Sequence, residues 1–270
     1  MSAKLIEVFS AIQGEGLNVG TRQIFVRFAG CDLRCSFCDS AHTWITPDTC
    51  RIEGNPGLRD FTIRSNPVGI EDLLAWVEQL DRPQLHDSIS ITGGEPLLHA
   101  PFLAEFLPQV RQRTGLPIYL ETAGHRPQQL ASILSDLDLV GMDIKLPSVS
   151  GETWWSEHDR FLRLCRDSQL QVFVKLIASD LTRSEELEKA ARLVANVSEK
   201  IPVFLQPVSA LSPELRQKNQ DLRTIEPKVS VADSERSPTP EKVLAWQALM
   251  KHWIESVRVV PQTHKMLDQL

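Results

Sequence analysis

Two kinds of apolar pattern alternate along most of the chain. Short apolar runs predict strands over residues 4–9, 22–29, 88–92, 116–121, 137–144, 170–177 and 201–206. Segments whose apolar residues recur every three or four positions predict helices over residues 70–80, 101–113, 127–135, 157–167 and 184–196. A last helix is expected to open at Thr239-Pro240-Glu241, with Trp246, Leu249 and Trp253 on one face.

From residue 88 onward, each predicted strand is followed by a predicted helix. This order gives parallel βα units with right-handed crossovers. We therefore predict an α/β fold, a partial TIM-like βα barrel of parallel strands, formed by one domain over residues 1–270. Residues 41–69 and 209–240 show no sustained period and are predicted as irregular excursions from that domain.

Unusual polar and glycine residues follow directly on the predicted strands. In βα barrels the functional residues gather where the strands end, so these residues are expected to share one face. They are the cysteine loop, Thr92-Gly-Gly-Glu95, Glu121-Thr122, Asp143-Ile-Lys145 and Gln206. Arg27 interrupts the apolar strand 22–29, and such an arginine points either to solvent or inward to an anion, because burying it unpaired is costly.

The cysteine loop carries Cys31, Cys35 and Cys38 in the spacing CxxxCxxC. A structural zinc site needs a fourth ligand at a regular spacing, and Cys50 and Cys165 lie too far along the chain to supply it. Three thiolates on a 4Fe-4S cluster would instead leave one iron open to a substrate or cofactor. The spacing favours such a cluster over a zinc loop or unpaired buried thiols.

Composition narrows the function classes. Hydrophobic residues make up 42% and charged residues 24%, which is typical of a globular protein. A net charge of −6 argues against binding nucleic acid over a broad face, because that binding depends on clustered lysine and arginine. No apolar run reaches the roughly 20 residues of a membrane helix, and no signal-peptide pattern opens the chain, so a cytoplasmic location is expected.

Several motifs resemble one known family in sequence and in order. CxxxCxxC with Phe37 before the last cysteine, followed one βα unit later by Gly-Gly-Glu-Pro, resembles the radical S-adenosylmethionine (SAM) superfamily. Within it, the 7-carboxy-7-deazaguanine synthase family is similar in Ser10-Ala-Ile-Gln-Gly-Glu-Gly16, Phe25-Val-Arg-Phe-Ala-Gly-Cys31, Cys38-Asp-Ser40, Thr92-Gly-Gly-Glu-Pro96, Glu121-Thr122, Asp143-Ile-Lys145, Gln206-Pro207 and Pro261-Gln-Thr-His-Lys265.

The resemblance implies an activity and its cofactors. The family rearranges 6-carboxy-5,6,7,8-tetrahydropterin into 7-carboxy-7-deazaguanine with loss of ammonia, in the biosynthesis of queuosine, a tRNA modification. The implied cofactors are a 4Fe-4S cluster, SAM, from which the cluster releases a 5′-deoxyadenosyl radical, and Mg2+. The implied partners are the pterin, an electron donor such as flavodoxin or ferredoxin, and a second copy in a homodimer, with no direct contact to nucleic acid or membrane.

The resemblance also implies roles for individual residues. Cys31, Cys35 and Cys38 would hold the cluster, and Ser40 the magnesium ion. The implied cofactor-binding residues are Phe37, Cys38, Asp39, Gly94, Glu95, Thr122, Asp143 and Lys145. The implied substrate-binding residues are Ile12, Gln13, Gly14, Glu15, Arg27, Thr92, Gln206 and His264. Arg27 would pair with the substrate carboxylate, and Glu95 with the amino group of SAM.

Two positions depart from the family pattern. Ser40 stands where the family usually has threonine, and a hard cation accepts either hydroxyl. Ala123 stands where the family more often has asparagine, so a side-chain contact is not expected there.

Two other functions stay open: an activase that acts on a partner protein and does not need Gln13 or Arg27, and a non-catalytic metal-binding module that would hold one zinc ion.

Overall fold

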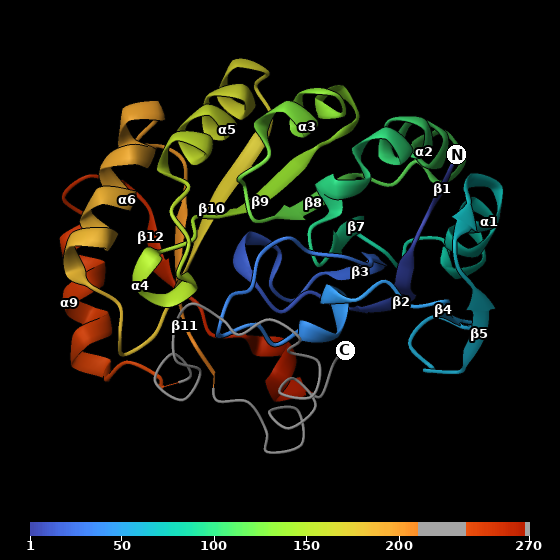
Figure 1. Ribbon diagram of the computed structural model, residues 1–270, viewed down its shortest axis with the longest axis horizontal. Helices are drawn as coiled ribbons and strands as arrows, with labels where there is room; N and C mark the ends of the chain where they lie inside the picture. Colours follow the sequence, from blue (N-terminus) through green and yellow to red (C-terminus); the bar gives the residue numbers. More distant parts are fainter. Residues whose placement is uncertain (210–235, 268–270) are drawn as a thin grey trace.

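Ten strands form one curved, open sheet in the computed structural model, which describes residues 1–209 and 236–267. The order across the sheet is β12-β11-β10-β9-β8-β7-β3-β2-β4-β5. Figure 1 shows the sheet bent into an arc, with the helices on its outer side. The strands are β2 (Leu5–Ile12), β3 (Arg22–Phe28), β4 (Thr49–Glu53), β5 (Phe61–Ser65), β7 (Ser88–Gly93), β8 (Ile118–Thr122), β9 (Leu139–Asp143), β10 (Gln171–Ala178), β11 (Val203–Pro207) and β12 (Val257–Val259).

The helices follow the strands in the predicted alternation. They are α1 (Ile70–Leu80), α2 (Ala100–Thr114), α3 (Pro127–Ala131), α4 (Pro147–Ser150), α5 (Trp155–Asp167), α6 (Ser184–Val197) and α9 (Pro240–Met250). Short 3-10 helices are η1 (Gly16–Asn18), η2 (Ala41–Trp44), η3 (Pro96–His99), η4 (Leu134–Asp136) and η5 (Thr263–Leu267). No helix in the described part of the chain is long and apolar enough to span a membrane.

The strands from β3 through β7 to β12 are all paired in parallel. Strand β2 joins β3 in antiparallel orientation and pairs in parallel with β4. Within the described residues, β12 and β5 are the two edges of this sheet and do not pair with each other. The predicted α/β fold and partial barrel are therefore confirmed, and the barrel is open.

The segment 41–69 is not irregular, which corrects the prediction from the sequence. Strands β4 and β5 form an antiparallel hairpin that extends the sheet beyond β2. The segment also holds β6 (Val68–Gly69), which pairs with β1 (Ser2–Ala3). The two hairpin strands have only five residues each, and only Cys50 and Ile52 are apolar core residues of β4, so their alternation is too short to stand out. Residues 210–235 of the second expected excursion lie outside the described residues.

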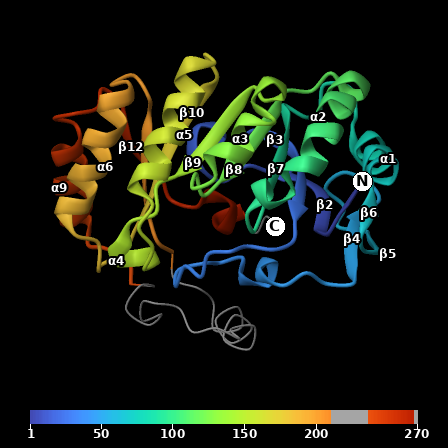
Figure 2. The same ribbon diagram turned by 45° about the horizontal axis from the view of Figure 1, so that its top comes forward.

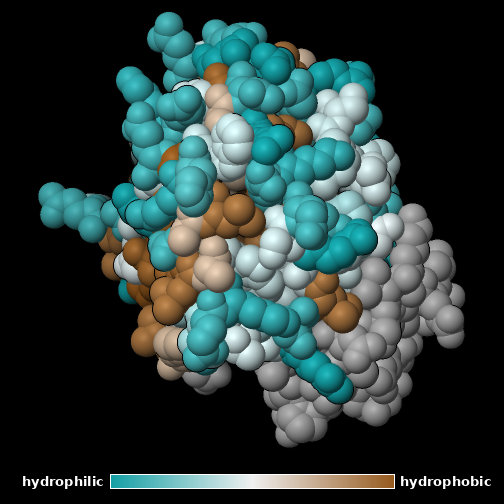
Figure 3. Space-filling model, turned by 90° about the vertical axis from the view of Figure 1, so that its left-hand side faces the viewer, coloured by the Kyte–Doolittle hydropathy of each residue, from teal (hydrophilic) through white to brown (hydrophobic). Residues whose placement is uncertain are grey.

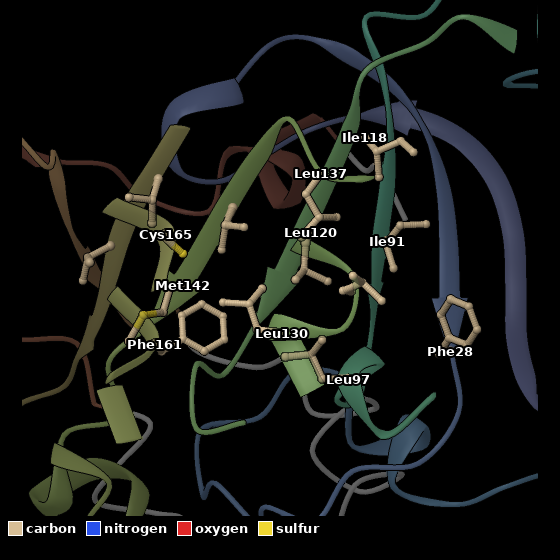
Figure 4. Close-up of a cluster of buried hydrophobic side chains, with 14 of the residues drawn as sticks. Phe28, Ile91, Leu97, Ile118, Leu120, Leu130, Leu137, Met142, Phe161 and Cys165 are labelled. Carbon is tan, nitrogen blue, oxygen red and sulfur yellow. The ribbon is translucent and has the colours of Figure 1, made fainter. Parts of the chain in front are cut away.

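The strands in the middle of the sheet pack one face under the helices, and their other face borders the hollow of the arc. Figure 4 shows side chains of the outer layer, including Ile91 of β7, Leu120 of β8 and Met142 of β9 against Leu130 of α3 and Phe161 of α5. All five side chains are fully buried. Because successive strand residues point to opposite faces, the neighbours of these apolar residues point into the hollow. This alternation positions the polar residues that follow.

Helix α9 begins where predicted, after Thr239, but ends at Met250 and so carries only part of the predicted face. Trp246 and Met250 are buried, whereas Trp253 lies beyond the end of the helix and is 37% exposed. Leu244 on the same helix is 65% exposed. Figure 3 shows the side of the molecule that carries α6 and α9, which is mostly hydrophilic and includes an apolar patch.

The outer layer provides a direct test of the packing. We expect Leu120→Ala to lower the free energy of unfolding by about 3 kcal/mol, because it removes a fully buried side chain at the centre of the sheet and leaves a cavity. Leu58→Ala, which truncates a leucine that is 71% exposed, should change the free energy of unfolding by less than about 0.5 kcal/mol. Urea denaturation of both variants measures the difference, and equal effects would contradict the described core.

Candidate active site

A pocket of about 420 Å³ lies where the strands end, in the hollow of the sheet. Its lining comes from both ends of the chain and from β2, β3, β4, β7, β8, β9, β10 and β11. The site residues predicted from the sequence that line it are Ile12, Gln13, Glu15, Arg27, Cys31, Cys35, Phe37, Cys38, Asp39, Ser40, Thr92, Gly94, Thr122, Asp143, Lys145, Gln206 and His264. Gly14 and Glu95 do not line it.

The cysteine loop follows β3 and carries three free thiols. Burial raises the pKa of Cys31 to about 12 and raises those of Cys35 and Cys38 as well, so without a metal all three are protonated at neutral pH. A single zinc ion would hold its sulfur ligands at about 2.3 Å and hence about 4 Å from one another. Among the described residues, these three sulfurs do not gather within 4.8 Å of one another. The donor set fits a larger metal cluster better than one zinc ion.

Two glycines let the end of β7 pack directly on the cysteine loop. A Cβ on Gly94 would lie 2.2 Å from the carbonyl oxygen of Gly30, and one on Gly93 would lie 2.3 Å from the carbonyl oxygen of Phe28. The backbone N–H of Glu95 donates to the same Gly30 oxygen at 2.9 Å. Any side chain at these positions would push the cysteine loop away from the sheet.

Glu95 lies behind the pocket wall. Its side chain is fully buried, and its carboxylate accepts hydrogen bonds from Thr122 Oγ1 at 2.8 Å, from the N–H of Ala123 at 2.9 Å and from the N–H of Leu97 at 3.0 Å. The structure therefore places the expected ligand of the SAM amino group in internal hydrogen bonds. Thr122, which donates to it, does line the pocket.

Glu15 is the centre of the polar wall. Its carboxylate accepts hydrogen bonds from Lys175 Nζ at 2.6 Å, Gln262 Nε2 at 2.8 Å and Gln206 Nε2 at 3.0 Å. Burial works to raise the pKa of Glu15, but the Lys175 ammonium and these hydrogen bonds hold it below its usual value. The pocket thus contains a fixed negative charge. The Oε1 atom of Gln206 is buried and has no hydrogen-bond partner in the described structure.

Two buried lysines flank Asp143 at the ends of β9 and β10. Lys145 Nζ lies 2.7 Å and Lys175 Nζ 3.4 Å from the Asp143 carboxylate. Burial works against the charged form of each lysine, but Asp143 and, for Lys175, Glu15 keep both pKa values above the ordinary one. Both ammonium groups are therefore positive at neutral pH. Lys145 also lies over the ring of Phe37, 5.6 Å from its centroid.

Gln13 is held by a second group of hydrogen bonds. Its Nε2 donates to Glu121 Oε1 at 2.6 Å and to Gln23 Oε1 at 3.1 Å, and its Oε1 accepts from the N–H of Glu15 at 3.0 Å. Thr92 Oγ1 donates to the other oxygen of Glu121 at 3.1 Å. Gln13 and Thr92 are thus held by Gln23 of β3 and Glu121 of β8 before any ligand binds.

The C-terminal segment closes one side of the pocket. Gln262 Nε2 donates both to Glu15 and to Asp39, at 2.8 and 2.7 Å, and Lys265 Nζ lies 3.2 Å from Asp39. The N–H of Thr263 donates to the carbonyl oxygen of Gly14, and a Cβ on Gly14 would lie 2.4 Å from the backbone nitrogen of His264. Gly14 is therefore covered by this segment. Figure 2 shows the segment, in red, on the hollow side of the sheet.

Comparison with known proteins identifies the family. The model of the radical SAM superfamily matches residues 25–205. A 7-carboxy-7-deazaguanine synthase from Geobacter sulfurreducens is 40% identical over 99% of this chain and 98% of its own length. This chain belongs to the 7-carboxy-7-deazaguanine synthase family. A synthase of the same name from Thermococcus kodakarensis is 32% identical over 77% of this chain and 84% of its own.

The fold agrees with this membership. The crystal structure of QueE from Escherichia coli matches with a TM-score of 0.54 and 20% identity, over 98% of this chain and 95% of that chain. Ala123, which departs from the family pattern, packs its methyl group against the cysteine loop beside Leu33 and Cys35. Its contact with Glu95 comes from the backbone N–H, which any residue would supply.

Several residues in and around the pocket were not predicted from the sequence. Lys175 interrupts the apolar run 172–177, which is the same signal that drew attention to Arg27 and could have found it. Gln262 lies within the quoted C-terminal motif but carries no signal of its own. His158, which shares no ligand spacing with another histidine, is fully buried behind the site.

His158 should make stability depend on pH. Neutral His158 donates from Nδ1 to the carbonyl oxygen of Gly124 and accepts the N–H of Lys145 at Nε2. Burial lowers its pKa from 6.5 to about 4, so the unfolded chain binds a proton at a higher pH than the folded chain. Stability is then complete above pH 6.5 and falls as the pH drops toward 4, by about 2 kcal/mol at pH 5.

Urea denaturation between pH 7 and pH 5 measures this loss. His158→Asn should remove about 2 kcal/mol of this loss and leave the part that comes from His86 and His99, whose pKa values burial also lowers. His252→Asn, which removes an exposed histidine, should leave the dependence as in the wild type. A wild-type protein equally stable at pH 7 and pH 5 would contradict the assignment.

Proposed function

We propose that the protein is a 7-carboxy-7-deazaguanine synthase, a radical SAM lyase that converts 6-carboxy-5,6,7,8-tetrahydropterin into 7-carboxy-7-deazaguanine with loss of ammonia. The observation that carries the proposal is the 40% identity over nearly the whole length of a protein with that name. The pocket supports it, because it joins a three-thiol loop to a wall of fixed amides and charges. The non-catalytic zinc module is disfavoured by the separation of the three sulfurs.

Three thiols and an adjoining polar wall fit a 4Fe-4S cluster with SAM. Cys31, Cys35 and Cys38 would hold the cluster, with Phe37 and Gly94 lining the space beside it. When bound, the two cofactors supply the one-electron chemistry that removes a hydrogen atom from the substrate. The buried Asp143 and Lys145 next to the loop would orient the polar groups of SAM.

The chain's own residues would bind and orient the pterin. A carboxylate accepts about four hydrogen bonds, and three protein donors already contact Glu15, which leaves it room for one ring N–H. The unpartnered Oε1 of Gln206 would accept a second. Arg27, which lines the pocket, would pair with the substrate carboxylate. Ile12, Thr92 and His264 would complete the wall.

We also infer a magnesium site at Ser40. The hydroxyl of Ser40 lies 3.1 Å from Asp39 Oδ1, and ligand atoms of Glu15, Asp39 and His264 lie within 4.8 Å of one another at the same corner. Oxygen ligands of this kind suit Mg2+. Omitting Mg2+ should lower product formation severalfold, Ser40→Thr should retain product formation, and Ser40→Ala should reduce it. Full turnover without Mg2+ would exclude this site.

We infer that the product is used in the synthesis of queuosine and related deazapurines, and hence in a tRNA modification pathway. We infer a cytoplasmic enzyme that takes electrons from a flavodoxin or ferredoxin, and a homodimer that uses the exposed apolar side chains of α9. Sedimentation of the reconstituted protein tests the last point, and a mass of one chain would contradict it.

A turnover assay tests the main proposal. Reconstituted, reduced protein with SAM, Mg2+ and 6-carboxy-5,6,7,8-tetrahydropterin should yield 7-carboxy-7-deazaguanine and one equivalent of ammonia. Arg27→Ala should lower product formation at least about 100-fold while SAM cleavage without product continues, because the substrate loses a charge-assisted contact. Arg27→Lys keeps the positive charge but not the planar guanidinium group with its paired N–H donors, so it should recover only part of the lost product formation. A competent cluster that cleaves SAM without forming product would overturn the proposal.

A further inference from the structure

A row of three charged side chains crosses the sheet at one end of the pocket. Glu7 on β2 is the register partner of Arg27 on β3 and of Arg51 on β4. Side chains directly opposite one another on neighbouring strands project from the same face. All three line the pocket.

Glu7 holds both arginines. Its Oε1 accepts a hydrogen bond from Arg27 Nε at 2.7 Å, and its Oε2 accepts one from Arg51 Nε at 2.6 Å. The Glu7 side chain is only 3% exposed, whereas those of Arg27 and Arg51 are 13% and 41% exposed. Burial works to raise the pKa of Glu7, but the two guanidinium groups hold it below its usual value, so the group is a carboxylate.

The charges in this row do not balance. One carboxylate faces two guanidinium groups, and within the described residues neither arginine pairs with a second carboxylate. Arg27 lies over the ring of Phe9 and Arg51 over that of Phe61, at 5.5 and 4.4 Å from the centroids, which orients the guanidinium groups without neutralising them. Arg27 alone would match the charge of Glu7. The row therefore leaves one positive charge at the pocket wall.

We propose that Arg51 is a substrate-binding residue that recognises the carboxylate of the substrate together with Arg27. The proposal rests on the proposed function, which supplies the carboxylated pterin. It gives the β4–β5 hairpin a role, because β4 brings Arg51 beside Glu7. Two guanidinium groups around one carboxylate neutralise its charge and also fix its orientation, because each presents N–H donors in a fixed plane. The surplus charge then pairs with the substrate.

The experiment compares two stable ligands that differ only in the carboxylate, 6-carboxypterin and pterin. Each is titrated into the reconstituted holoenzyme with SAM, and the dissociation constants are measured by pterin fluorescence. Arg51→Ala leaves Glu7 paired with Arg27, so the buried carboxylate keeps a partner. The matched control is Arg64→Ala, which removes the same charge from the same hairpin, at an exposed position outside the pocket.

Arg51→Ala should weaken the binding of 6-carboxypterin about tenfold or more and change that of pterin less than about twofold. Arg51→Lys should recover part of the loss, and Arg64→Ala should bind both ligands like the wild type. Equal weakening of both ligands, or unchanged binding of 6-carboxypterin, would overturn the role of Arg51. If the proposed function itself is wrong, the wild-type enzyme forms no deazaguanine product in the turnover assay. That outcome is distinct from a failure of the role of Arg51.

Discussion

The balance of buried charge on the inner face of the sheet is the constraint on which the site depends. Lys175, in the middle of the concave wall, contacts both Glu15 and Asp143, and Asp143 in turn contacts Lys145. Removing one member would leave a buried charge without its partner, which costs several kcal/mol. These contacts join β9 and β10 to the segment that follows β2. They also keep Glu15 ionised and fixed in position, which is what recognition of a ring N–H requires.

Close backbone packing joins this charged wall to the cysteine loop. Gly93 and Gly94 bring the end of β7 against Phe28 and Gly30, and the C-terminal segment joins Glu15 to Asp39 through Gln262. The loop that would hold the cluster and the wall that would hold the substrate are therefore one connected structure. A radical generated beside the loop would have its target held in place, and little of the site must form when ligands bind.

The sequence predicts the fold and much of the site because the signals are local. The βα alternation, the cysteine spacing and the residues at strand ends all arise from short stretches of chain. The remaining contacts join distant positions: Lys175 meets Glu15 across 160 residues, and Gln262 meets it across 247. No short stretch of sequence predicts contacts between residues that lie so far apart in the chain. The same holds for Glu95, whose carboxylate accepts hydrogen bonds from Thr122 and Ala123, 27 and 28 residues further along the chain, while its contact with SAM stays a prediction.

The most direct measurement is a crystal structure of the reconstituted protein with its cluster, SAM and 6-carboxy-5,6,7,8-tetrahydropterin. We expect the substrate carboxylate to lie between Arg27 and Arg51, and the pterin ring edge to lie against Glu15 and Gln206. A substrate bound outside the pocket, or with its carboxylate against the Lys145 side of the wall, would contradict the charge distribution from which the binding mode is inferred.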